Sequence, residues 1–338
     1  MLTSKSEWLS LLLDVQKYDF NHTYDSHFIE KDNSETPIML RYVEGDVIIG
    51  LPLLVRNIFD TPYKDATSLW GYGGPISKGV NAEFDNINFL TALKEYFISE
   101  NIIAVFSRLN PYIQFQKTIL NNIGNIIING KVVYIDLNKD PAEQRKNYQR
   151  RLKTYVNKIR RECEVISTSC EEGLRDFIGL YYESMNRVNA DKRYYFDYNF
   201  INNLFESSDF ETELLLVRHK ELNKIIAGGI FIKTGDIIQY HLSGVANEFL
   251  YLAPTKLLID EMRVKANLEK KFKYFNLGGG LGGNDNDSLF KFKLSFSKQT
   301  FDFELWNWII DNDVYNKLVE EMKINKNASF FPLYRYEK

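Results

Sequence analysis

YFNLGGGLGGNDNDSLFKFKLSF, residues 274–296, carries a short apolar strand directly into a run of glycines. Five glycines within six positions, 278–283, cost backbone entropy on folding and offer no packing, which is typical of a loop with positive φ or of close approach by another group. After the loop, Lys291 and Lys293 alternate with phenylalanines, and this alternation predicts a strand with both lysines on one face. The pattern fits a functional site or a glycine-rich hairpin with a solvated lysine face.

The composition is that of a globular protein with sizeable cores. The chain has 338 residues, of which 44% are hydrophobic and 14% aromatic, and its length is closer to two domains than to one. The net charge of -3 gives no overall attraction to nucleic acid, so we expect no DNA partner, and any polyanion contact must come from a local patch.

The cysteines and the first residues bear on the compartment. Cys163 and Cys170 have no second pair with which to form a metal cluster or a disulfide framework, which favours free thiols in a reducing compartment. The apolar stretch near residues 8–15 is too short for a secretion signal or a membrane span. A cytoplasmic protein is therefore predicted.

Each half of the chain has the same order of predicted elements. In the first half, a helix over 6–18 precedes strands within 37–58 and 65–77, a helix over about 83–100 and a strand at 102–109. In the second half, three strands within 213–246 precede a helix over about 254–270 and a strand at 274–278. This order predicts a duplicated α/β unit, with domains at 1–138 and 139–338.

A basic segment lies between the two halves. Asp140 is a predicted helix cap with Pro141 at the first helical position, and apolar residues recur at helical spacing from Leu152 to Ile159. Residues 145–161 contain eight basic residues and no acidic one. We therefore predict a basic connecting helix, followed by a second helix over about 171–190 and an aromatic segment at 194–200.

Six segments together resemble one known family. They are YDFNHTYDSHF at 18–28, GLPLLVRNI at 50–58, SLWGYGGPIS at 68–77, YYESMNRVNADKRYYF at 181–196, FNLGGG at 275–280 and SLFKFKLSF at 288–296. With the basic helix, they resemble the Fem-type (peptidoglycan bridge aminoacyltransferase-like) branch of the GNAT acyltransferase superfamily over nearly the whole chain. The resemblance implies an α/β (α+β) fold of two tandem GNAT-like units, each a mixed, mainly antiparallel sheet flanked by helices.

The same resemblance implies transfer of an acyl or aminoacyl group to an amine of a sugar, a sugar nucleotide or a cell-wall precursor. The long helical hairpin common in peptidoglycan-bridge enzymes is absent, which weakens the expectation of a charged-tRNA donor. The turn ANEFLYLAPTKLL, residues 246–258, lacks the glycines with which GNAT enzymes bind the coenzyme A pyrophosphate at a helix N-terminus. The ordinary mode of coenzyme A binding is therefore also in doubt.

Candidate catalytic residues follow from what amine acylation requires: a deprotonated amine, a polarised carbonyl and a protonated leaving group. Lys293 matches the lysine of the Fem-type segment, which implies oxyanion stabilisation or phosphate binding, with Lys291 as a substrate-binding neighbour. Asp285 and Asp287 are candidate acceptors of the amine proton, or form an ordinary turn. His241 is a candidate base or a core histidine.

Candidate acceptor-binding residues come from three segments. Arg56 follows the PLL strand, and Tyr72 and Gly73 lie in the GYGG turn, which allows close backbone approach or is simply a tight turn. The match to the Fem-type aromatic segment implies acceptor contacts for three further residues, for which core packing is the alternative. They are Asn189, Tyr194 and Tyr195.

The basic helix offers candidate phosphate ligands. Its cations suit a lipid-linked head group or a tRNA acceptor stem, and a solvated charged face is the alternative. The residues are Arg150, Arg151, Lys158 and Arg161. The four histidines show no ligand spacing with cysteines or paired carboxylates, so no metal is expected.

The sequence therefore predicts an enzyme, an N-acyltransferase of cell-envelope polysaccharide synthesis. The predicted donor is acyl-coenzyme A and the predicted acceptor is the amino group of a nucleotide- or lipid-linked amino sugar, with peripheral contact to a membrane-linked acceptor included. One alternative is a Fem-type aminoacyltransferase that uses charged tRNA on a cell-wall precursor. The other is a catalytically silent module that binds a glycan or nucleotide sugar.

Overall fold

The computed structural model describes residues 1–323 and 330–336. Contacts within the chain divide it into two compact units: unit 1 is Met1–Asn129 with Asp302–Lys338, and unit 2 is Gly130–Phe301. The sequence-based division after residue 138 did not include the return of the last segment to unit 1.

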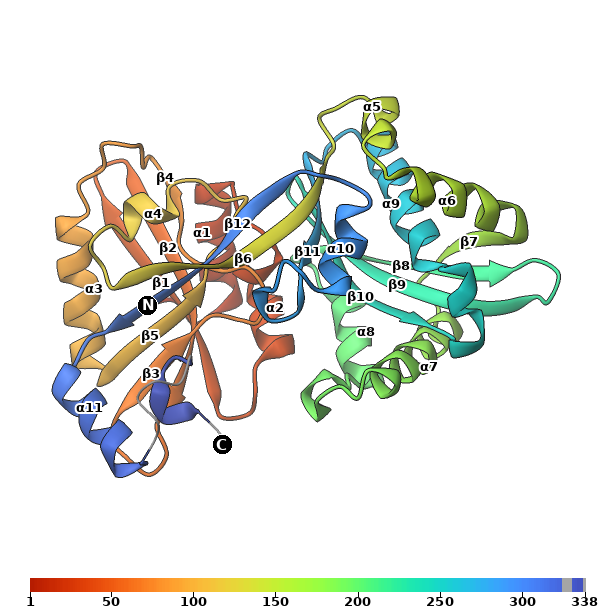
Figure 1. Ribbon diagram of the computed structural model, residues 1–338. Coiled ribbons are helices and arrows are strands. Elements are labelled where there is room, and N and C mark those ends of the chain that lie inside the picture. Colours follow the sequence, from red (N-terminus) through yellow and green to blue (C-terminus); the bar gives the residue numbers. More distant parts are fainter. Residues whose placement is uncertain (324–329, 337–338) are drawn as a thin grey trace. The chain divides into compact units, whose positions relative to one another are not determined.

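Unit 1 is a mainly antiparallel sheet with helices packed against it (Figure 1). The strand order is β1-β2-β3-β5-β12, with β4 beside β2; β3 and β5 are parallel and the other pairs are antiparallel. Its elements are α1 (Lys5–Val15), η1 (Phe20–His22), α2 (Tyr24–Glu30), β1 (Glu35–Glu44), β2 (Val47–Asn57), β3 (Lys64–Thr67), β4 (Ile76–Lys78), α3 (Ile87–Ser99), β5 (Ile102–Arg108), α4 (Gln116–Ile119), β12 (Thr300–Ile309), α11 (Asn312–Glu321) and η5 (Leu333–Arg335).

In unit 2 the strand order is β6-β11-β10-β9-β8-β7. Here β10 and β11 are the parallel pair. The elements are β6 (Asn125–Asp136), α5 (Pro141–Lys146), α6 (Arg150–Glu162), β7 (Cys163–Thr168), α7 (Glu171–Arg187), η2 (Lys192–Tyr194), α8 (Tyr198–Glu206), β8 (Glu211–His219), β9 (Lys224–Thr234), β10 (Ile237–Val245), η3 (Asn247–Leu252), α9 (Thr255–Glu269), β11 (Tyr274–Gly279), η4 (Leu281–Gly283) and α10 (Ser288–Leu294).

The duplicated α/β organisation predicted from element order is confirmed. In each unit, three successive antiparallel strands precede a helix and a strand parallel to the last of the three. These are β1–β3, α3 and β5 in unit 1, where the short β4 lies between β3 and α3, and β8–β10, α9 and β11 in unit 2. Each unit also has its own apolar core, which includes Phe97 and Trp306 in unit 1 and Phe231 and Phe275 in unit 2.

Two predicted elements are different in the structure. Residues 288–294 form the helix α10 and not a strand, because Asp287 caps the first turn and the buried residues Phe290 and Lys293 recur at helical spacing. The single basic helix is two helices, α5 and α6, because the chain breaks at Tyr148, whose side chain is buried, and the amide of Gln149 donates to Ser295.

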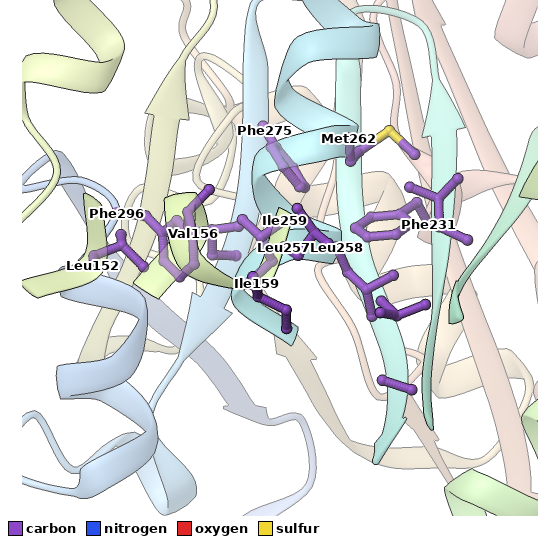
Figure 2. Packing of buried hydrophobic residues seen from close by; sticks show 14 of the residues in the cluster. Leu152, Val156, Ile159, Phe231, Leu257, Leu258, Ile259, Met262, Phe275 and Phe296 are labelled. Carbon is purple, nitrogen blue, oxygen red and sulfur yellow. The ribbon is translucent and has the colours of Figure 1, made fainter. Parts of the chain in front are cut away.

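Helix α6 is attached to α9 by an apolar seam. Figure 2 shows Val156 and Ile159 of α6 toward the first turns of α9 and Leu152 beside Phe296, all within the core of unit 2. The three residues recur at intervals of three and four, so they share one side of the helix and leave its charged side exposed.

A buried carboxylate also joins the two helices through hydrogen bonds and ion pairs. Asp260 of α9 is fully buried and accepts hydrogen bonds from Arg145 (3.1 Å), Arg160 (2.7 Å), Tyr148 (2.9 Å) and Arg263 (3.1 Å). Burial alone would raise the pKa of Asp260, but the guanidinium groups and the Tyr148 hydroxyl outweigh burial and hold the pKa below its ordinary value. Two of the cations of the basic segment therefore serve the fold.

We predict that Asp260→Ala lowers the free energy of unfolding by about 3–5 kcal/mol, because it leaves the buried Arg263 guanidinium without its carboxylate. Urea unfolding of both proteins measures the difference. The matched control is Glu261→Ala, which removes a partly exposed partner of Arg160 and should cost less than about 1 kcal/mol. Equal losses in the two variants would contradict a central role for Asp260.

Candidate active site

The candidate site lies where the parallel strands β10 and β11 separate. Their ladder covers only three residue pairs and ends at Gln239 and Asn276. Beyond this point β10 is bonded to β9 as far as Val245, and β11 is bonded to β6 through Gly278 and Gly279. The facing edges of the two strands thus diverge, which opens the sheet at its parallel pair.

Both strands are irregular at the point of separation. A β-bulge interrupts β10 between Tyr240 and Leu242, and the register of β11 shifts between Asn276 and Gly278. The buried Asn276 side chain accepts a hydrogen bond from the amide of Gly278 at 2.8 Å, which fixes this shift. Bulges of this kind re-aim side chains and often lie beside active sites.

The glycines after β11 are required by close contacts. Gly278 has a φ of +82°, and a Cβ at Gly279 would lie 2.7 Å from the Lys131 carbonyl oxygen. A Cβ at Gly280 would lie 2.5 Å from Oδ2 of Asp287. The loop therefore follows a path on which side chains do not fit, as the sequence indicated.

Lys293 is directed at this loop from α10. Its ammonium group donates a hydrogen bond to the carbonyl oxygen of Gly279 at 2.7 Å, and only 8% of the residue is exposed. Burial lowers the pKa of Lys293 to about 8, against the opposing effect of the Asp287 charge. Lys291 points to solvent from the same helix, so the structure separates the two lysines.

The two aspartates of the loop differ in what they bind. Asp287 accepts from the amides of Phe290 and Leu281, and the Phe290 hydrogen bond in particular holds the pKa of Asp287 below its ordinary value. Asp285 is half-buried, and its Oδ1 has no hydrogen-bond partner among the described residues. Asp285 is therefore the carboxylate with an uncommitted oxygen.

His241 lies in the bulge of β10, just beyond the last pair with β11. Burial lowers the pKa of His241 to about 4, so its imidazole is neutral at pH 7. His241 therefore lies on β10, two residues beyond the point where β10 and β11 separate.

The predicted acceptor residues of unit 1 are held by the fold. Arg56 forms an ion pair of 2.8 Å with the buried Asp65, which Arg335 and Tyr334 also contact. The Tyr72 amide donates to Asn21, and its ring packs edge-on against Phe303 at 5.4 Å between centroids.

Gly73 is bonded to both sides of its turn. Its amide donates to the carbonyl of Arg108 at 2.8 Å, and its carbonyl accepts from Gln116 at 2.9 Å. Gln116 was not among the predicted residues, nor was the buried Asn110, which donates to the carbonyl of Tyr72 at 3.0 Å.

The other predicted acceptor residues lie in unit 2, after α7. Asn189 has a φ of +49° just beyond the end of this helix, a conformation that asparagine tolerates well. The Tyr195 hydroxyl donates to Asn186 at 2.7 Å, and the Tyr194 carbonyl accepts from Tyr181 at 2.8 Å. These contacts tie the aromatic segment to α7.

Sequence reasoning singled out the glycines but missed one residue of the site, Asn276. Asn276 positions Gly278, and the carbonyl of Gly279 is the group that receives Lys293. The available signal was a buried polar residue inside an apolar strand, directly before the glycines.

Three further observations concern a separate cavity, metal binding and membrane-spanning helices. A cavity of about 480 Å³ opens between α7, the start of β9 and the start of η3, and no predicted site residue lines it. Within residues 1–323 and 330–336, no three side chains of His, Cys, Asp or Glu are grouped to hold a metal ion. No helix in the same ranges has the length and apolar character needed to cross a membrane.

Comparisons with known proteins give matches among solved structures only. No protein-family model and no curated protein matches the chain. The crystal structure of FemX matches with a TM-score of 0.73 at 16% identity, covering 94% of this chain and 98% of that one. A tandem GNAT protein from the clavulanic acid biosynthesis pathway matches with a TM-score of 0.52 at 10% identity, covering 92% and 97%.

A third match is the C-terminal domain of a putative lysylphosphatidylglycerol synthetase from Agrobacterium fabrum. Its TM-score is 0.55 at 11% identity, and the alignment covers 96% of this chain and 99% of that one. The predicted tandem GNAT fold of Fem-like type is therefore confirmed.

We predict that Lys293→Met is at least as stable as the wild type at pH 7. The pKa of Lys293 falls from 10.5 to about 8 on folding, so the buried charge costs stability wherever both states are protonated. As the pH rises from about 8 to about 10.5, the folded state releases its proton first and wild-type stability increases. The advantage of the methionine should therefore shrink at high pH.

Urea unfolding at neutral and alkaline pH measures this trend. Lys291→Met is the control, because it removes an exposed lysine from the same helix and leaves the buried Lys293 in place. A methionine variant that is less stable at pH 7, with no change toward alkaline pH, would show that Lys293 supports the fold.

Proposed function

We propose that the chain is an acyltransferase that transfers an aminoacyl group to the amino group of a cell-envelope precursor. The observation that carries the proposal is the buried Lys293 ammonium, held on the Gly279 carbonyl where β10 and β11 diverge. A desolvated cation beside an opening in a sheet is suited to stabilise negative charge that develops on a reacting carbonyl.

The reaction needs no covalent enzyme intermediate. The acceptor amine attacks the carbonyl carbon of the donor ester, the carbonyl oxygen takes the negative charge, and Lys293 stabilises that oxyanion. The C–O bond to the leaving alcohol then breaks, the amide forms, and the alcohol oxygen takes a proton while the amine loses one. Asp285 is the proposed acceptor of the amine proton because its Oδ1 is uncommitted.

The geometry of the parallel pairs supports unit 2 as the donor unit. In unit 1 the pair β3 and β5 stays bonded beyond the strands: the amide of Ser68 donates to Phe106 at 3.0 Å and that of Gly73 to Arg108 at 2.8 Å. That sheet is therefore closed where the sheet of unit 2 is open.

The start of α9 favours an aminoacyl ester over acyl-coenzyme A. Its first amides are already bonded locally, those of Lys256 to Ala253 and of Leu257 and Leu258 to Pro254. In addition, Leu257 and Leu258 are buried. Few free donors thus remain for a pyrophosphate at this helix N-terminus. The Fem-type resemblance accordingly makes charged tRNA the proposed donor.

Transfer from acyl-coenzyme A to an amino sugar is the second candidate. It is supported by the same opening of the sheet and by the match to a tandem GNAT protein. The donor is the point on which the two candidates differ, and one assay separates them.

We predict that label from aminoacyl-tRNA appears in a nucleotide-linked cell-wall precursor when the wild-type protein is present. Labelled acetyl-coenzyme A with a nucleotide-linked amino sugar serves as the parallel arm. Transfer in the second arm alone would show that the donor is acyl-coenzyme A and not aminoacyl-tRNA. Calorimetric binding of the precursor without transfer in either arm would instead identify a silent binding module.

We predict that turnover requires the charged form of Lys293. Lys293→Met should lower kcat about 10²–10³-fold, while the affinity for the acceptor stays nearly unchanged. The wild-type rate should fall as the pH rises through about 8, where Lys293 loses its proton.

Asp287→Asn tests this assignment because asparagine caps helices as well as aspartate does. Removing the Asp287 charge removes the effect that raises the pKa of Lys293, so the falling limb should move to lower pH. Lys291→Met, the control, should keep the wild-type profile. A rate that increases through pH 8 would instead make Lys293 a base.

A further inference from the structure

We propose that the exposed basic side of α6, together with the segment that leads into α9, docks unit 2 on the surface of an anionic phospholipid bilayer. The proposal does not depend on the transfer chemistry. It rests on how the fold sorts the charges and the apolar side chains of these elements.

The fold places six of the eight cations of the basic segment in two sets. Arg145 and Arg160 turn inward to the buried Asp260, at 3.1 and 2.7 Å. The other set is exposed on α6 and consists of Arg150, Arg151, Lys158 and Arg161. Because successive helical residues are about 100° apart, these four side chains fall within an arc of about 100°.

Few carboxylates face this arc. Among the described residues, the ion pairs made from α6 are those of Arg160 with Asp260 and Glu261, and that of Lys158 with Glu162 at a long 3.9 Å. The face therefore has an excess of positive charge, although the whole chain has a net charge of -3. Such a local excess is complementary to an anionic surface.

Aromatic and apolar side chains border the cations. Tyr155 of α6 is 41% exposed, and the ammonium of Lys256, at the start of α9, lies 3.8 Å from the centre of its ring. Just before α9, η3 exposes 43% of Leu250 and 69% of Tyr251. These elements share one core, because Phe249 and Leu252 of η3 are buried in the same cluster as Val156 and Ile159 of α6.

This combination favours a bilayer over RNA. Tyrosine and leucine side chains beside lysine and arginine suit the head-group region, where cations meet lipid phosphates and the apolar groups meet the acyl boundary. Leu250 would add nothing to a contact with RNA phosphates. The apolar side of α6 is already used in the core, so α6 itself does not insert, and attachment is mainly electrostatic and reversible.

The experiment is co-sedimentation of the full chain with vesicles of phosphatidylglycerol and phosphatidylcholine, and with vesicles of phosphatidylcholine alone. We expect binding to the anionic vesicles that is lost at high salt. Arg150→Gln with Arg151→Gln should weaken this binding about five-fold for each cation removed. Leu250→Ser with Tyr251→Ser should weaken it without abolishing its dependence on salt.

The matched control removes two exposed cations elsewhere in unit 2, with Arg175→Gln and Lys192→Gln. It should retain more binding than the α6 variant, and unchanged urea midpoints would show that both variants are folded. Equal binding to neutral and anionic vesicles, or equal loss in the two charge variants, would overturn the proposal. It would also fail if the α6 variant lost affinity for tRNA while no variant altered vesicle binding, since the face would then be an RNA site.

Discussion

The short ladder between β10 and β11 is the constraint on which the candidate site depends. Three residue pairs hold the parallel strands together, and the shift that Asn276 fixes at Gly278 then directs β11 away. Because the backbone groups of Gly278 and Gly279 are bonded to β6, the separation leaves few unsatisfied groups on β11 itself. The loop that follows can therefore approach Lys131 and Asp287 closely, and only glycine fits along that path.

Lys293 places a buried cation at the point where the two strands separate. A buried ammonium with a lowered pKa is unfavourable for the fold, so its position needs support from other residues. Asp287 supplies that support twice: it caps α10, which sets the direction of Lys293, and its charge opposes the effect of burial. One carboxylate thus connects the glycine loop, the helix and the cation. Its acceptor oxygens are already committed to amides, which is why Asp285 is the better candidate for proton transfer.

Sequence patterns predicted the parts of the structure that depend on local periodicity. The strand series, the helix near residues 254–270 and the duplicated order follow from apolar spacing and turn residues. Residues 288–294 were wrongly predicted as a strand because lysine and phenylalanine alternate there. The residue that indicates a helix is the N-cap Asp287, which lies just before the alternating pattern. The tertiary roles of Gln116, Asn276 and Asp260 were not predictable, since each depends on partners distant in the sequence or on a local shift in strand pairing.

The basic segment shows how one charge run can serve two purposes. Without Asp260, Arg145 and Arg160 would lose their buried partner, and α6 would lose polar contacts that help to fix its rotation on α9. With Asp260, these two cations are bonded to α9, and the helical period places Arg150, Arg151, Lys158 and Arg161 on the side of α6 opposite to its apolar seam. The apolar seam and the carboxylate buried in α9 therefore together set which side of α6 faces solvent. The charge of that face follows from the packing of the core, and not from the composition of the chain, which is slightly acidic.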